Sequence, residues 1–246
     1  MQEIISHFAA QYSLTRSEVM LEIESVFSAT LSEWYGFKVM VFFNDNLELE
    51  TTAYHKVKGV VIQGEVDIAR MRGRNTLKRQ LERRLARVAL LKQTAHYKQH
   101  EKELCWGEIT GCDAEHNLHV ETEIIPGERI IATCPLNRIG VHERNSPNLS
   151  VGTERAFHLR RIDPVLLNGT PRLNVTVDRV SKTLVETLLM EQLGPAAEKV
   201  SIRCTKRFVG HKSFVLTSRK IPKSAILAVT EELGEKMEVK FSTGAR

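Results

Sequence analysis

The chain has 246 residues, of which 42% are apolar and 26% are charged. This composition is ordinary for a globular protein, so it disfavours a disordered chain, and no apolar run approaches the roughly 20 residues that a membrane-spanning helix needs. The length exceeds one average domain and favours two or three small ones. The net charge of +5 permits phosphate-bearing partners without requiring them.

The N-terminus and the cysteines both favour a cytoplasmic protein. Residues 1–10 carry Glu3 early and no basic leader, so we expect no signal peptide. The cysteines are scattered and form no C-x-x-C pair, which favours small buried hydrophobic side chains in a reducing compartment. They are Cys105, Cys112, Cys134 and Cys204.

Two helices are expected at the start of the chain. Residues 2–12 place apolar side chains on one helical face. Thr15 and Glu18 then have the spacing of a capping box, in which each side chain accepts a hydrogen bond from a backbone N–H of the first turn. Apolar residues follow at helical period, and Gly36 is suited to end this second helix.

A β region is expected next. Residues 37–43 are rich in β-forming residues, Asn44-Asp45-Asn46 predicts a turn, and residues 47–54 alternate as a return strand. Residues 56–62 are a candidate for a further strand. Residues 1–70 should therefore form a small α+β domain.

A long basic helix should connect this domain to the next, over residues 71–103. Asn75 can cap it, and the helix is expected to run to about residue 102. Its predicted buried stripe consists of Leu77, Leu81, Leu85, Val88 and Leu91. Five basic residues cover much of its remaining surface, either as a solvated face or as a surface for phosphates or acidic groups. They are Lys78, Arg79, Arg83, Arg84 and Arg87.

Short strands separated by turn residues are expected over residues 104–180. The predicted strands are residues 105–111, 118–122, 128–133, 154–162 and 173–177. Five short strands with a long third connection fit a barrel of the OB type. Closing a sheet in this way removes its unpaired edges.

The last segment, residues 181–246, has a mixed pattern. A helix is expected from Ser181 to Leu193, followed by two alternating strands on either side of Gly210. Pro222 suits the first turn of a second helix, which Gly234 can end. Residues 237–241 alternate as a third strand. The fold class expected for the whole chain is a multidomain α+β protein.

One part of this segment resembles a known family. Residues 223–234, KSAILAVTEELG, followed by Met237-Glu238-Val239, resemble the second half of the first KH domain of the NusA family of bacterial transcription factors. The upstream hairpin, residues 200–217, lies where the first two strands of that domain belong. The resemblance implies a polymerase-binding domain at 1–70, a connector helix at 71–103, an OB-type RNA-binding barrel at 104–180 and a KH-like domain at 181–246.

The KH-like segment departs from the family in the loop that grips RNA. KH domains use a G-x-x-G loop, in which glycines let backbone amides approach phosphates. Residues 220–223 read Lys-Ile-Pro-Lys here, and Pro222 has no amide donor. The spacer helix before this loop is also expected to be missing. Arg219, Lys220 and Lys223 can still attract phosphates as point charges, so both an RNA-binding and a purely structural or protein-docking role stay open for this segment.

The resemblance and the charge pattern together give the candidate site residues. For RNA binding these are Arg79, Arg83, Arg84, Arg87, Trp106, His119, His158, Arg160, Arg161, Lys206, Arg207, Lys212, Arg219, Lys220 and Lys223. For polymerase binding they are Arg16, Glu22, Ser25, Ser28 and Glu33.

The sequence contains no catalytic motif that we recognise, and the spacing of His116, His119 and Glu121 is a weak indication of a metal site. We therefore expect no enzyme activity, cofactor, metal, membrane partner or small-molecule substrate. The leading hypothesis is a NusA-like regulator of elongation, termination or antitermination that binds RNA polymerase and nascent RNA. The alternatives are an RNA-binding regulator that acts without polymerase and a protein adaptor that has lost RNA binding.

Overall fold

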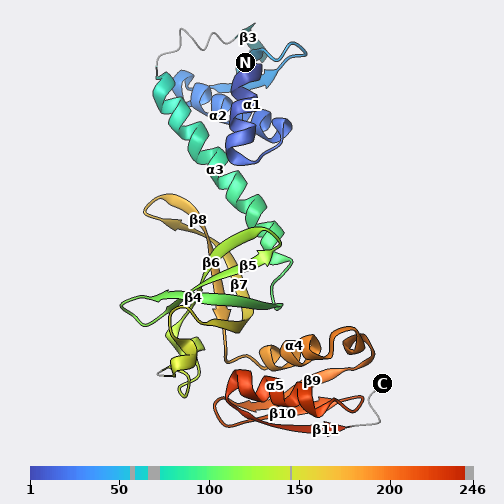
Figure 1. Ribbon diagram of the computed structural model, residues 1–246. Coiled ribbons are helices and arrows are strands. Elements are labelled where there is room, and N and C mark those ends of the chain that lie inside the picture. Colours follow the sequence, from blue (N-terminus) through green and yellow to red (C-terminus); the bar gives the residue numbers. More distant parts are fainter. Residues whose placement is uncertain (56–58, 66–72, 145, 242–246) are drawn as a thin grey trace. The chain divides into compact units, whose positions relative to one another are not determined.

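The computed structural model describes residues 1–55, 59–65, 73–144 and 146–241 (Figure 1). These residues contain five α-helices and three β-sheets, which confirms the expected α+β class. The chain divides into two compact units. The first is Met1–Gln93 with Leu166–Pro171, and the second is Thr94–Val165 with Arg172–Arg246.

The first unit begins with the two expected helices, α1 (Gln2–Tyr12) and α2 (Arg16–Tyr35). The capping box is present, because the Glu18 N–H donates to the Thr15 hydroxyl at 3.2 Å and the Thr15 N–H donates to Glu18 Oε2 at 2.6 Å. Gly36 ends α2 with a positive φ of 70°. Local sequence was sufficient here because a helix cap involves only neighbouring residues.

An antiparallel sheet in the order β1-β2-β3 follows, with β1 at Lys38–Phe43, β2 at Leu49–His55 and β3 at Gly59–Glu65. Strand β1 alternates, so that Val39 and Val41 join the core of the unit while Met40 and Phe42 are exposed. The hairpin and the further strand are confirmed, although residues 56–58 of the predicted third strand lie outside the described residues.

Helix α3 (Arg74–Lys98) is the expected long basic helix, with two local corrections. It begins before Asn75, because the Gly73 carbonyl accepts the N–H groups of Thr76 and Leu77. Leu77, Leu81 and Leu85 are buried as predicted, but Leu91 is 50% exposed and Leu90 is buried instead. Tyr97, near the end of the helix, is 1% exposed and belongs to a different core from Leu77, Leu81 and Leu85.

The second unit contains a closed sheet of five strands in the order β4-β5-β6-β8-β7 (Figure 1). Every predicted strand in this region is present. The strands are β4 (Leu104–Cys112), β5 (Leu118–Ile125), β6 (Glu128–Cys134), β7 (Glu154–Leu167) and β8 (Thr170–Asp178). The long connection between β6 and β7 carries two 3-10 helices, Leu136–Arg138 and Pro147–Leu149.

Gly107 shows how tightly the strands of this closed sheet approach one another. A Cβ atom at this position would lie 2.4 Å from Val120 Cγ1 and 2.9 Å from the Glu121 carbonyl oxygen. Gly107 has no positive φ, so its backbone conformation does not by itself require glycine. Glycine is needed here because a side chain would collide with the neighbouring strand.

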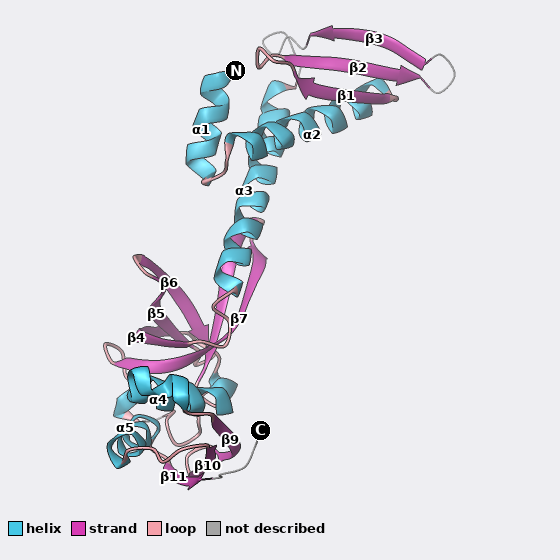
Figure 2. Ribbon diagram, turned by 90° about the vertical axis from the view of Figure 1, so that its right-hand side faces the viewer, coloured by secondary structure: helices cyan, strands magenta, loops and turns pink. Residues whose placement is uncertain are grey.

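The rest of the second unit is an α/β layer with α4 (Lys182–Leu193), β9 (Ile202–Phe208), β10 (Lys212–Thr217), α5 (Lys223–Leu233) and β11 (Lys236–Phe241). Its sheet has the order β11-β10-β9, with β10 antiparallel to β9 and parallel to β11. Both helices lie on the same side of this sheet (Figure 2). They share a buried core with it that includes Leu184, Leu188, Val215 and Val229.

Candidate nucleic-acid interface

The four candidate arginines of α3, Arg79, Arg83, Arg84 and Arg87, are all exposed. Three of them line a groove of about 640 Å³ between α2 and α3, together with Glu22 and Glu33. Arg84 Nε donates to Glu22 Oε2 at 2.7 Å. The fold thus brings residues predicted separately for RNA and for polymerase into one groove with both charges on its walls.

The remaining candidate polymerase residues of α2 differ in accessibility. Arg16 is exposed, whereas Ser25 is half-buried. Ser28 is also half-buried, and its hydroxyl accepts the Val41 N–H at 2.8 Å. Ser28 therefore fastens β1 to α2, which is a structural role that its sequence context did not indicate.

The candidates on the closed sheet are only partly free to meet a ligand. The Trp106 indole N–H donates to Glu191 Oε1 of α4 at 2.8 Å, and the residue is 37% exposed. His119 is half-buried on β5. Arg160 and Arg161 are exposed, but each has a carboxylate neighbour, Asp178 at 3.3 Å and Asp163 at 2.5 Å respectively.

Two candidate RNA-binding residues, His158 and Arg207, are buried, which corrects the expectation that they face a ligand. His158 is 6% exposed, and its Nδ1 lies 3.3 Å from Asp178 Oδ2. The side chain of Arg207 is 2% exposed and forms a bidentate pair with Glu235. His158 does not face solvent, because β7 is covered on both faces: Phe157 packs in the closed sheet and Ala156 packs in the α/β layer.

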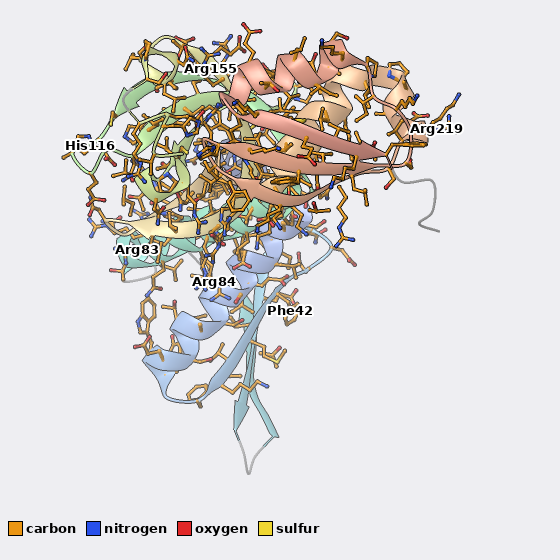
Figure 3. The ribbon with its side chains drawn as sticks, turned by 90° about the horizontal axis from the view of Figure 1, so that it is seen from below. Phe42, Arg83, Arg84, His116, Arg155 and Arg219 are labelled. Atoms are coloured by element: carbon orange, nitrogen blue, oxygen red, sulfur yellow. The ribbon has the colours of Figure 1, made fainter. Side chains whose placement is uncertain are left out.

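The charged residues of the β10–α5 connection are the most accessible candidates in the second unit. Arg219, Lys220 and Lys223 are all exposed, and Figure 3 shows Arg219 projecting away from the protein. Pro222 precedes α5 as its N-cap, so it lies just outside the helix. These cations are therefore available to phosphates as charges.

The largest fully buried side chain among the described residues is that of an arginine, which the sequence did not indicate as buried. Arg179, between β8 and α4, is 1% exposed. It contacts Glu143 Oε1 at 2.6 Å and Glu232 Oε1 at 2.9 Å, and it donates to the Ala156 carbonyl at 2.7 Å. These partners lie in the β6–β7 connection, in α5 and in β7, so Arg179 joins the closed sheet to the α/β layer. No local motif marks the three residues, because their positions are far apart in the chain.

Asp178 is the buried acid that directly precedes Arg179 in the chain. Its environment leads us to expect that the protein loses stability in acid. Burial by itself raises the pKa of Asp178, but hydrogen bonds from His158 and the Ser181 backbone N–H outweigh it and lower the pKa from 3.8 to about 2. A depressed folded-state pKa stabilises the protein above the unfolded pKa and ceases to do so as pH falls through the folded one. We expect about 2 kcal/mol to be lost between about pH 4 and about pH 2.

Urea unfolding at a series of acidic pH values measures this loss. Asp178→Asn removes the titrating group, so the free energy of unfolding of the variant should change less than that of the wild type over the same pH range. Parallel pH profiles for the wild type and the variant would contradict the assignment.

The part of the chain that the structure describes contains no group of three or more His, Cys, Asp or Glu side chains placed to hold a metal ion. Cys105, Cys134 and Cys204 are buried as expected, whereas Cys112 is exposed. No helix in the described ranges is long and apolar enough to cross a membrane.

Comparison with known proteins leaves the family of this chain open. No protein-family model matches it, and no curated protein matches it with significance.

Proposed function

We propose that this chain is a non-catalytic regulator of transcription elongation, termination or antitermination, built on the plan of NusA. The observation that carries the proposal is the order of the folded elements. A helix pair and a three-stranded sheet come first, then a long basic helix, a closed five-stranded sheet and an α/β layer. This is the order that the resemblance of residues 223–239 implies.

In this proposal the closed sheet is an OB-type barrel and the α/β layer is a KH-like domain. The long connection between the third and fourth strands of the barrel supports the first assignment. The succession α4-β9-β10-α5-β11, with β10 parallel to β11, supports the second. Helix α5 follows β10 without an intervening helix among the described residues, in keeping with the expected loss of the spacer helix.

The N-terminal unit would dock on RNA polymerase through α2, and exposed basic residues would meet nascent RNA. Such a regulator needs no catalytic residue, because it acts by stabilising some states of the polymerase over others. The exposed cations at Arg219, Lys220 and Lys223 would contribute by charge, since a loop without glycines cannot bring backbone amides close to phosphate.

The direct test is photo-crosslinking of the full chain to polymerase in a paused elongation complex. A photoreactive residue at Arg16 or Glu33, both exposed on α2, should crosslink to a polymerase subunit. The same residue at Arg219 should crosslink to RNA or to nothing. Absence of polymerase crosslinks from α2, under conditions in which full-length NusA crosslinks, would refute polymerase docking.

A second candidate function is an RNA-binding regulator that acts without polymerase. The observation in its favour is the groove in which Arg83, Arg84 and Arg87 converge. It predicts that Arg83→Ala with Arg84→Ala weakens RNA binding and makes log affinity fall less steeply with log salt, by roughly 0.7 for each phosphate of a single strand that the variant no longer neutralises. RNA binding that does not change with salt would argue against it. If the full chain bound no RNA at all, the adaptor hypothesis would be favoured.

A further inference from the structure

The sheet β11-β10-β9 has one face that no helix covers. Helices α4 and α5 pack on the opposite face (Figure 2). On that face Cys204, Ser213, Val215 and Thr217 are buried. Side chains alternate along a strand, so the residues between these positions point to the uncovered face. Figure 3 views the α/β layer from the side of its sheet.

The strand register places these outward residues in rows across the sheet. Phe214, in the central strand, has Lys206 and Glu238 as its neighbours. Lys212 lies between Phe208 and Lys236 in the next row. The third row consists of Arg203, Leu216 and Lys240. The open face therefore has one aromatic ring, Phe214, on its central strand and another, Phe208, at the end of an edge strand, with basic side chains around them.

The two rings form a small aromatic platform. Phe208 and Phe214 lie edge to face, with ring centroids 6.2 Å apart and an interplanar angle of 75°. Phe208 is 47% exposed, so a ligand can reach its ring, and Phe214 is half-buried. A hollow of about 290 Å³ beside the rings is also lined by Lys206 and Lys240.

Lysine ammonium groups already lie over both rings. Lys206 Nζ is 4.5 Å from the Phe208 centroid, and Lys212 Nζ is 5.0 Å from the Phe214 centroid. A cation over a ring is a weak contact at an exposed site. A base can therefore displace the ammonium group from the ring face, and the displaced lysine remains close enough to pair with the phosphate of the same nucleotide.

The charge of this face selects an anionic ligand. Its rows contain five basic residues and one acid, Glu238. Glu238 lies 2.6 Å from Lys212 Nζ and 3.5 Å from Lys240 Nζ, so it occupies two of the cations. Arg203, Lys206 and Lys236 have no ion-pair partner among the residues that the structure describes. A second copy of this face would be repelled, because like charges would meet.

We propose that this open face binds single-stranded nucleic acid, with bases stacked on Phe208 and Phe214 and phosphates held by the surrounding lysines. Aromatic rings interleaved with cations are the combination that binds single strands, because every base has a flat face and every nucleotide has a phosphate. The site is separate from the β10–α5 connection and from the arginines of α3. It deepens the proposed function and rests on it for its biological role, since it assigns RNA contact to a new surface.

The test is the affinity of the full chain for oligoadenylates of about 12 nucleotides, long enough to span one such module, as RNA and as DNA. Phe208→Leu keeps an apolar side chain but removes the ring, and it should weaken binding by roughly 5- to 150-fold, the range for losing one stacked base. Phe241→Leu is the matched control, because Phe241 is 49% exposed but is aligned with the inward-facing Thr217. It should leave the affinity unchanged.

A second variant gives the opposite sign and cannot be explained by misfolding. Glu238→Gln frees Lys212 and Lys240, so it should strengthen binding and make it more sensitive to salt. Equal affinity for RNA and DNA would support stacking with phosphate contacts alone, whereas preference for RNA would support the same site with an added contact to the 2′-hydroxyl.

The proposal is overturned if neither oligonucleotide binds. It is equally overturned if Phe208→Leu and Glu238→Gln bind as the wild type does, including the case in which only Lys220→Gln with Lys223→Gln weakens binding. Polymerase crosslinking of the wild-type chain separates the open-face site from the proposed function. If the wild-type chain crosslinks to polymerase from α2 but binds neither oligonucleotide, the open-face site is wrong and the proposed function stands.

Discussion

Replacing Arg179 with leucine should lower the free energy of unfolding of the second unit by about 3–5 kcal/mol. The substitution leaves Glu143 and Glu232 without their buried cation, and it removes the donor to the Ala156 carbonyl. An unpaired carboxylate inside a protein costs far more than a surface charge, because it has lost its water and gained no partner. Glu143 Oε2 already lacks a hydrogen-bond partner among the described residues, so Glu143 has little means to compensate.

The measurement has to isolate the second unit, because a chain with two units need not unfold in a single transition. Trp34 lies in the first unit and Trp106 in the second, so a Trp34→Phe background makes tryptophan fluorescence report on the second. Arg161→Leu is the control. The Arg161 side chain is 70% exposed, and its pair with Asp163 should contribute at most about 1 kcal/mol. Equal effects of the two substitutions would contradict a structural role for Arg179.

Arg207→Leu is expected to have a comparable effect, about 3–5 kcal/mol, within the α/β layer. Glu235 is 3% exposed, and Arg207 contacts it through both Nε and Nη2. Burial by itself raises the pKa of Glu235, but the hydrogen bonds and the charge of Arg207 outweigh it, so the pKa is lowered. The carboxylate therefore stays charged in the wild type and would lose its main partner in the variant.

A double-mutant cycle tests whether this loss comes from an isolated charge. Arg207→Leu with Glu235→Leu should be less destabilising than the sum of the two single substitutions, because no buried charge is then left alone. Strict additivity would mean that the two side chains stabilise the layer independently. Arg207 also donates to the Ser181 carbonyl, on the face of the sheet that the helices cover. Its neighbours in β9, Lys206 and Phe208, lie on the open face.

Features that depend on neighbouring residues were predictable from the sequence. Thr15 and Glu18 identified the start of α2, and Gly36 identified its end, because these residues satisfy backbone groups within one turn. All five strands of the closed sheet were predicted from alternation and turn residues. The start of α3 was predicted wrongly, at Asn75. The first hydrogen bonds of the helix are accepted by the backbone carbonyl of Gly73, and no capping side chain marks that position in the sequence.

Site residues were harder to predict, because exposure depends on what packs against a strand from elsewhere in the chain. His158 and Arg207 have polar side chains in alternating strands, and both are buried against residues distant in sequence. The exposed cations Arg219, Lys220 and Lys223 were predictable, because a short connection between a strand and a helix lies at the surface. The sequence did not indicate that Phe208 and Phe214 are neighbours. Their rings lie close together only because of the register between β9 and β10.

The sequence alone therefore determined the succession of helices and strands and the basic character of α3. Only the tertiary structure decided which charges are buried and which face of the last sheet is open. The reason is physical: hydrogen-bonded turns and periodic apolar residues act over a few residues, whereas Arg179 meets Glu143 and Glu232 across 36 and 53 positions of the chain. Pairing of that kind depends on how the layers pack, and no local pattern encodes it.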